Sequence, residues 1–275
     1  MAITAQDVNK LRKMTGAGMM DCKKALTEAD GDFDAAVDII RKRGQVIAST
    51  RADREATEGA VLSRVDATGK YGALIVLNCE TDFVAKNEGF VALANSILDV
   101  AIASKPANLE ALKALDLGGV SVADKVTEQS GVIGEKIDLS AFEAIEAESV
   151  AAYIHAGNKL ATIVGFNQPS VDAQVGKDVA MQIAAMAPIA VDRNAVDQAT
   201  IDHELEIGKD MARNEGKPEA MLDKIAQGRL NKFFKESTLM EQEFIKDSKK
   251  SIGQYLEGVS KGLAPVTFKR VSLTN

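Results

Sequence analysis

Tyr71-Gly72-Ala73-Leu74-Ile75-Val76-Leu77 is the stretch of sequence that decides the fold, because a short, almost uninterrupted apolar run is typical of a buried β-strand. Before it, Val61, Ser63 and Val65 alternate with their neighbours as on a half-buried strand, and Asp66-Ala67-Thr68-Gly69 has the composition of a turn. We therefore predict that the two strands form an antiparallel hairpin.

The segment after this hairpin, Thr81-Asp82-Phe83-Val84-Ala85-Lys86-Asn87, separates it from a long helical pattern that ends at Pro106. Phe83 stands beside a carboxylate at an element boundary, in a chain with only 4% aromatic residues and no tryptophan. We place the segment in a loop and expect Phe83 to reach into a partner. The alternative is that its ring packs against the helix that carries Phe90.

A similar unit recurs about 89 positions later. Val150 to His155 and Leu160 to Phe166 have the pattern of two strands around the turn Ala156-Gly157-Asn158, and an apolar helical face follows up to Pro188. Where the first unit has Thr81 to Val84, the second has Gln168-Pro169-Ser170-Val171. The repeated architecture therefore does not by itself require a Phe.

Three short helices are predicted before the first hairpin. Thr4 and Asp7 can cap the first, which ends at Gly16, and the third is expected to stop at Gly44. The inward faces are Val8, Leu11 and Met14, then Cys22, Ala25 and Leu26, then Phe33, Ala36, Val37 and Ile40. So small a bundle buries a compact core, which we expect to leave Met19 and Met20 partly outside. A linker from Ala48 to Glu58 follows.

A helical hairpin is predicted in the last third of the chain, from Ile201 to Asn214 and from Glu219 to Glu236, with Gly216-Lys217-Pro218 between them. Its narrow apolar seam would join Ile201, Leu205 and Met211 to Leu222, Ile225 and Phe233. Homodimerisation through this hairpin, docking on the body and binding of another factor all remain open. A helix near Lys249 to Lys261 and a strand from Val266 to Val271 are the last predicted elements.

Charge and composition exclude several classes of protein. The chain has 275 residues and a net charge of −7, which argues against direct nucleic-acid binding. Residues 1–54 carry ten Lys and Arg against eight Asp and Glu, so a slightly basic module precedes an acidic body. No apolar stretch approaches the roughly 18 residues of a membrane span, and residues 1–7 lack a signal-peptide pattern, so we expect a cytoplasmic protein.

Sites for covalent chemistry are weakly supported. Cys22 and Cys79 are the only cysteines and lie 57 positions apart, so they predict buried thiols rather than a disulfide framework or a zinc site. No GxxxxGK[ST] phosphate loop occurs, and the histidines, His155 and His203, fall in different elements. A hydrolase using Cys79, or Glu80 and Asp82 as an acid/base pair, is the least favoured hypothesis. We expect no metal and no cofactor.

Two long strings resemble bacterial translation elongation factor Ts: Thr15-Gly16-Ala17-Gly18-Met19-Met20-Asp21-Cys22-Lys23-Lys24-Ala25-Leu26 and Asn78-Cys79-Glu80-Thr81-Asp82-Phe83-Val84-Ala85-Lys86-Asn87. The resemblance continues through Tyr153-Ile154-His155-Ala156-Gly157 and through Gly216-Lys217-Pro218-Glu219 with Gly228-Arg229, so it covers nearly the whole chain in order.

The predicted fold class is α+β. A small N-terminal three-helix, UBA-like module precedes two related antiparallel hairpin-plus-helix subdomains, with an antiparallel helical hairpin inserted. We divide the chain into residues 1–55, the helical module and linker; 56–140, the first core subdomain; and 141–275, the second, with the hairpin at 200–237.

The resemblance implies a guanine-nucleotide exchange factor that binds elongation factor Tu, in its GDP-bound and nucleotide-free forms, without being an enzyme itself. Asp82 and Phe83 would enter the G domain of that partner, and Thr81 to Val84 would be the segment associated with Mg²⁺ displacement. Arg12, Met19 and Met20 would resemble contacts to a G-domain helix, and His155 lies in the hairpin that approaches the partner. The chain ends soon after Val271, so contacts from a further C-terminal helical segment of some members are not expected.

A second hypothesis belongs to a different class: a noncatalytic scaffold whose helical module and hairpin bind some other protein. Recovery of a translational GTPase as the bound partner would separate the first hypothesis from this one.

Overall fold

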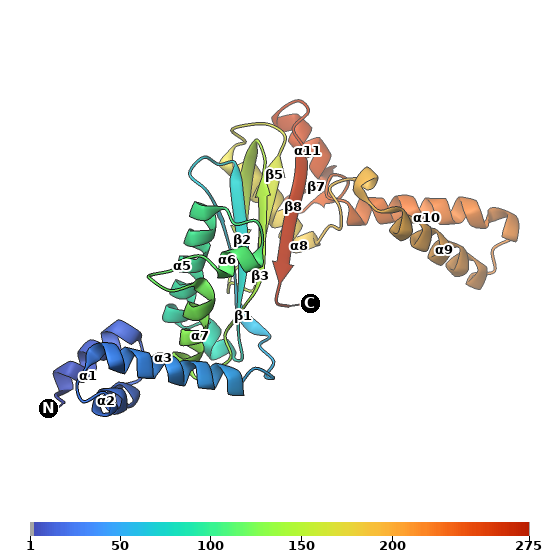
Figure 1. Cartoon of the computed structure of the whole chain (residues 1–275). Helices are drawn as coiled ribbons and strands as arrows, with labels where there is room; N and C mark the ends of the chain where they lie inside the picture. Colours follow the sequence, from blue (N-terminus) through green and yellow to red (C-terminus); the bar gives the residue numbers. More distant parts are fainter. Residues whose placement is uncertain (1–2, 275) are drawn as a thin grey trace.

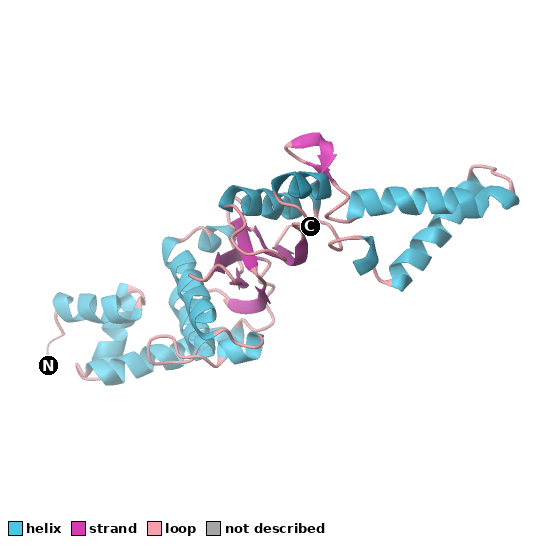
Figure 2. Ribbon diagram, turned by 90° about the horizontal axis from the view of Figure 1, so that it is seen from above, coloured by secondary structure: helices cyan, strands magenta, loops and turns pink. Residues whose placement is uncertain are grey.

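The protein is elongated, with three parts that follow one another along its length. A computed structural model describes residues 3–274. Figure 1 shows a helical module at the N-terminal end, a body of strands and helices in the middle, and a pair of long helices at the opposite end. Figure 2 shows the same order from above, so both helical parts project away from the body.

The N-terminal module contains three helices, α1 (Ala5–Thr15), α2 (Met19–Glu28) and the first part of α3 (Phe33–Thr50). The predicted cap is confirmed, because the Thr4 hydroxyl accepts from the backbone of Asp7 while the Asp7 carboxylate accepts from Thr4. Most of the predicted inward residues are buried, but Phe33, Val37 and Ile40 are only partly buried, and Met14 lies half exposed at 54%. Ala17, which was not predicted, is also buried.

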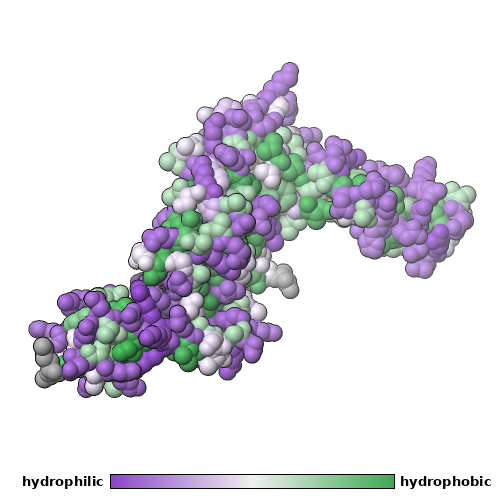
Figure 3. All heavy atoms as spheres, in the orientation of Figure 1, coloured by the Kyte–Doolittle hydropathy of each residue, from purple (hydrophilic) through white to green (hydrophobic). Residues whose placement is uncertain are grey.

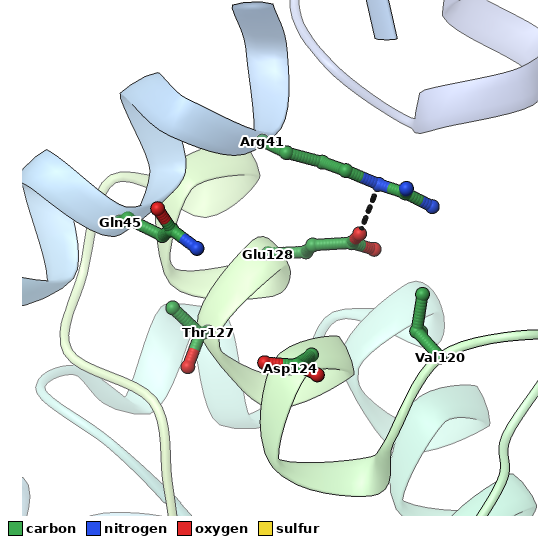
Figure 4. Close-up of a pocket in the computed structure, with 6 residues that line it drawn as sticks. All are labelled: Arg41, Gln45, Val120, Asp124, Thr127 and Glu128. Atoms are coloured by element: carbon green, nitrogen blue, oxygen red, sulfur yellow. Dashed lines mark ion pairs between the residues drawn. The ribbon is translucent and has the colours of Figure 1, made fainter. Parts of the chain in front are cut away.

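Helix α3 continues through Gly44, so the prediction that it stops there is wrong. Gly44 is buried because it meets Gly131 on α7 (Val122–Ile133). A Cβ atom added at Gly131 would lie 2.1 Å from the Cα atom of Gly44, closer than any side chain tolerates. The glycine here serves a close helix crossing rather than a helix end. Arg41 and Glu128 form an ion pair of 2.6 Å beside this crossing (Figure 4).

The first sheet has the antiparallel order β1-β2-β3, formed by Glu58–Val65, Tyr71–Cys79 and Asp138–Glu146. The predicted hairpin is confirmed, whereas β3 was not foreseen. Every residue of the central strand β2 is buried. Ala73, Ile75 and Leu77 belong to the core beneath the helices, and Leu74 and Val76 belong to a separate cluster with the second sheet.

Helices cover one face of the first sheet. Phe90, Leu93 and Ile97 of α5 (Glu88–Ser104) are buried there as predicted. The short helix α6 (Leu109–Lys113) and α7 complete this layer. A further short helix, α4 (Asp82–Ala85), joins β2 to α5.

The second sheet has the antiparallel order β4-β5-β8, formed by Ser149–Ile154, Leu160–Phe166 and Pro265–Ser272. Helix α8 (Ala173–Met186) covers it, as the repeated pattern predicts. The last predicted helix is shorter than expected: Asp247–Ser251 forms strand β7, paired with β6 (Glu243–Phe244), before α11 (Ile252–Val259) begins. The two sheets pack face to face through Val61, Leu74, Val76, Ile145, Ala161 and Ile163.

The predicted helical hairpin is formed by α9 (Gln198–Asn214) and α10 (Leu222–Ser237), with the short 3-10 helices η1 (Arg193–Ala195) before α9 and η2 (Glu219–Met221) before α10. Its seam differs in detail from the prediction. Gly208 lies against Ala226, where an added Cβ would come within 3.0 Å of the Ala226 Cα, and Met211 is 47% exposed. Figure 3 shows hydrophilic residues over most of the hairpin on the face in view.

The α+β fold class is confirmed, with the three-helix module, two small antiparallel sheets and the inserted helical hairpin in the predicted order. The division of the chain at residues 55 and 140 stays a prediction. Within residues 3–274, no helix is both long enough and apolar enough to cross a membrane.

Gly131→Ala is expected to destabilise the protein by about 1–3 kcal/mol, because the added methyl group forces two helix backbones apart. The control is Gly228→Ala in α10, where an added Cβ meets no atom within 4 Å. That change should stabilise by about 0.5–1 kcal/mol through helix propensity. Urea-unfolding midpoints followed by circular dichroism give both values. Two variants of equal stability would contradict the proposed crossing.

Candidate functional site

The segment Thr81 to Asn87 was predicted to be a loop, and this prediction is wrong for Asp82–Ala85, which are helical. Asp82–Ala85 form the single turn α4 directly after the end of β2, and Thr81 is its N-cap. The Thr81 hydroxyl accepts from the backbone N–H of Val84 at 3.4 Å. Thr, Asp and Asn are common at helix starts, and Thr81 and Asn87 cap two successive helices here.

Phe83 is the most exposed large apolar side chain among the described residues, with 82% of its surface accessible. On the same turn, Ala85 is buried and Val84 packs partly against the core beneath the helices. Phe90 is fully buried. The alternative in which Phe83 packs against the Phe90 helix is therefore wrong, and the ring is available to another molecule.

Asp82 is paired with Lys86 on the next turn, at 2.6 Å between carboxylate and ammonium. The hydrogen bond from Lys86 holds the pKa of Asp82 below its ordinary value, and Lys159 contributes a smaller attraction. Asp82 therefore carries its negative charge beside the exposed ring at neutral pH.

Two glutamates hold the residues that lead into α4. Glu135, just after α7, accepts from the backbone N–H groups of Glu80 and Thr81, both at 3.1 Å, and from the Thr81 hydroxyl at 2.7 Å. Glu80 in return accepts from the backbone N–H of Lys136 at 2.6 Å. Each glutamate thus binds the backbone of the other's segment.

The hydrogen-bonded residues around Glu80 also bind the end of α3. Arg51 donates to both carboxylate oxygens of Glu80, at 2.8 and 2.9 Å. The Lys136 ammonium donates to the backbone carbonyls of Ala52 and Arg54. Sequence analysis missed Arg51, Glu135 and Lys136, because their partners lie roughly 30 to 85 positions away and no local pattern marks them.

The pKa of Glu80 lies below its ordinary value of 4.5, mainly because the Lys136 N–H donates to the carboxylate and secondly because of Arg51. The carboxylate is only 14% exposed. The carboxylate is occupied by the Lys136 N–H and the Arg51 guanidinium, so it does not form the acid/base pair with Asp82 considered in the sequence analysis.

The predicted contacts on the module are exposed. Met19 and Met20 begin α2 and are 49% and 64% accessible, and Arg12 lies exposed on α1. Figure 3 shows apolar atoms at the surface of this module. These residues lie on a different part of the molecule from Thr81 to Val84, and α3 connects the two.

His155 is exposed at the β4–β5 turn, where its Nδ1 lies 2.9 Å from the Tyr153 hydroxyl. The same turn touches the start of β1: Val61 donates to the Asn158 carbonyl at 2.7 Å, and Lys159 pairs with Glu58 at 2.8 Å. Because Glu58 pairs with Cys79 in the sheet, the His155 turn lies at the same edge of the body as α4.

Cys79 is unsuited to nucleophilic catalysis. Burial, followed by the nearby carboxylates of Glu135 and Glu58, raises the pKa of its thiol to about 12. The thiol donates to the Thr81 carbonyl at 3.2 Å, so it supports the segment structurally. Both cysteines are free and buried, as predicted. Residues 3–274 hold no group of three His, Cys, Asp or Glu side chains arranged for a metal ion.

Fold and surface together define a class: a two-sheet α+β protein with a helical module at one end, a helical hairpin at the other and an exposed aromatic on the body between them. The family model for elongation factor Ts matches residues 80–275. Elongation factor Ts of Amoebophilus asiaticus is 55% identical over 98% of this chain and 99% of its own length. Those of Christiangramia forsetii and Porphyromonas gingivalis are 55% and 54% identical, over 98% and 99% of each chain. The chain belongs to the elongation factor Ts family.

Glu80→Gln is expected to destabilise the protein at neutral pH and to matter less in acid. Because the folded pKa is depressed, the carboxylate's contribution is complete above about pH 4.5, the unfolded value, and is lost as the pH falls through the folded value. Urea midpoints of both proteins between about pH 3 and pH 7 measure this.

The matched control for that experiment is Glu110→Gln, which removes one charge from a side chain that is 82% exposed. A difference between wild type and Glu80→Gln that stays constant over the whole pH range would contradict the assignment.

Proposed function

We propose that this protein is a guanine-nucleotide exchange factor for elongation factor Tu, acting in the cytoplasm during the elongation phase of protein synthesis. It binds the GDP-bound form, promotes release of GDP and holds the nucleotide-free form. Membership of the elongation factor Ts family supports this proposal. The observation that carries it is Phe83, an aromatic ring 82% exposed on a helical turn whose N-cap, Thr81, donates from its backbone and its hydroxyl to Glu135.

The proposed mechanism is insertion of Thr81 to Val84 into the partner's G domain, where the Phe83 ring and the Asp82 carboxylate disturb the Mg²⁺ site. The metal is the partner's, so the chain needs no cofactor and no covalent step. Arg12, Met19 and Met20 bind the partner separately from this segment, and His155 adds a contact at the edge of the body that also carries α4.

The free energy gained by burying one Phe limits how far Phe83 alone can accelerate GDP release. Burying one Phe is worth roughly 1.5–3 kcal/mol, and each tenfold change in rate corresponds to about 1.4 kcal/mol of barrier. One ring therefore supplies about two decades of acceleration at most. The remainder comes from binding energy spread over the module and the body. Because coupling is reciprocal, fresh nucleotide binding to the partner expels the factor in turn.

Phe83→Ala should lower the maximal stimulated rate of GDP release by about tenfold to a hundredfold, as the loss of one buried ring predicts. Stopped-flow release of a fluorescent GDP from purified elongation factor Tu, titrated with the factor, measures the maximal rate and the half-saturating concentration. Val266→Ala, at another apolar side chain that is 53% exposed, is the control and should behave as wild type. Undiminished stimulation by Phe83→Ala would remove the ring from the mechanism.

We further propose that the α9–α10 hairpin supports a homodimer. A shallow surface hollow along it is lined by Ile207, Met211 and Phe233 together with the charged side chains of Glu204, Arg229, Lys232 and Glu236. Ile207 and Met211 are 37% and 47% exposed, so the hairpin keeps apolar surface that its own seam does not bury.

Met211→Glu should shift a dimer to monomer, because a charge in an apolar contact is costly to desolvate. Sedimentation velocity at several protein concentrations measures the change, and Glu206→Gln on the exposed side of α9 is the control. A wild type that sediments as a monomer throughout would refute the homodimer while leaving the exchange function intact.

A further inference from the structure

Helix α4 cannot order itself. It is a single turn of four residues, whereas isolated helices shorter than about 12–15 residues are marginal in water. Its cap Thr81 and the preceding Glu80 lie beyond the end of β2, so the pairing of the sheet does not hold their backbone N–H groups. Whatever fixes the orientation of Phe83 must therefore come from outside the segment.

Packing of Val84 and Ala85 against the core provides part of that support, and Glu135 provides the hydrogen bonds to the backbone. Its carboxylate accepts three hydrogen bonds, from the two backbone N–H groups and from the Thr81 hydroxyl. The Thr81 hydroxyl also accepts from the Val84 N–H, so Glu135 orients the very group that caps α4. Hydrogen bonds to an ionised acceptor are stronger than those between neutral groups.

Glu135 is itself fixed on two sides. It follows Gly134, which ends α7 in the left-handed region at φ 80°, and the next residue, Lys136, donates its N–H to Glu80. The backbone segments 80–81 and 135–136 are therefore joined by hydrogen bonds to each other's carboxylates, so a shift of one segment breaks hydrogen bonds to the other.

Helix α3 connects these hydrogen-bonded segments to the N-terminal module. Helix α3 starts in the module, crosses α7 at Gly44 and Gly131, and ends at Thr50; its C-cap, Arg51, binds Glu80. Figure 4 shows the Arg41–Glu128 pair that joins α3 to α7 beside the crossing. The exposed methionines of the module and Phe83 are thus held at a set separation through α3 and α7.

We propose that Glu135 is a positioning residue for nucleotide exchange: it holds α4 so that Phe83 meets the partner in one orientation while the module is bound. This inference rests on the proposed exchange function. Glu135 touches neither nucleotide nor metal, and it acts through the backbone of Glu80 and Thr81.

The test uses the full chain with Glu135→Ala and two readouts. Amide hydrogen exchange, read on peptides spanning residues 80–87, should accelerate by about tenfold, since the N–H groups lose an ionised acceptor. Peptides from β1 and β2 should keep the wild-type rate, which separates a local effect from a loss of overall stability. In stopped-flow GDP release, the maximal rate should fall by about tenfold while the half-saturating concentration changes by less than about twofold.

Two further variants complete the design. Glu135→Gln keeps an oxygen that can accept from the two N–H groups, so it should recover most of the lost rate. Glu110→Ala removes a glutamate side chain that is 82% exposed on α6, and it should match wild type in both readouts.

Unchanged hydrogen exchange at residues 80–87 in Glu135→Ala would overturn the inference. It would equally be overturned if exchange accelerated there while the maximal rate of GDP release stayed at the wild-type value. If wild type itself fails to stimulate GDP release, the proposed function fails, and the hydrogen-exchange readout still decides whether Glu135 holds the segment.

Discussion

Burial of strand β2 on both faces is the constraint on which the rest of the structure depends. Ala73, Ile75 and Leu77 face the helical layer, and Leu74 and Val76 face the second sheet, so one strand contributes to two cores. A strand of this kind has no solvent face and tolerates neither a register slip nor a polar residue in its middle. Its position also sets where the chain leaves the sheet, and α4 begins within three residues of that point.

The Phe83 ring is apolar and exposed, whereas the backbone before it is fixed by polar contacts. Phe83 is displayed to water, at a cost in hydrophobic burial, whereas the backbone leading to it donates to the carboxylate of Glu135, from a segment distant in sequence. Glu80 in return accepts from the backbone N–H of Lys136. A contact residue on a rigid base loses little conformational entropy on binding, so more of its interaction energy is available at the partner. These hydrogen bonds hold the short helix α4 in a fixed position on the body.

The two halves of the body differ at the corner where the chain leaves the central strand, after β2 in the first half and after β5 in the second. In the first half the chain after β2 forms α4 and exposes Phe83. In the second half Gln168 follows β5, and its side chain bonds to Ser260 and to the Lys261 carbonyl, so the loop before β8 lies against it. At the first corner Phe83 is exposed, whereas at the second corner the loop before β8 binds Gln168 and leaves Pro169 and Ser170 exposed. The difference arises from the residues at the corner and from what packs over them, rather than from the sheets.

The sequence by itself determined the hairpins and the long helices, because these depend on local periodicity and turn residues. It also marked Phe83 as a contact residue, because the string of side chains around it is specific enough to resemble a family. It could not predict that α3 runs through Gly44, that Asp138–Glu146 completes the first sheet, or that α4 is helical. Those outcomes depend on contacts between distant segments: Gly44 with Gly131, β3 with β2, and Glu135 with Glu80 and Thr81. Only the tertiary structure decides them, since a glycine or a glutamate has the same local preferences whether or not its partner lies some ninety or fifty positions away.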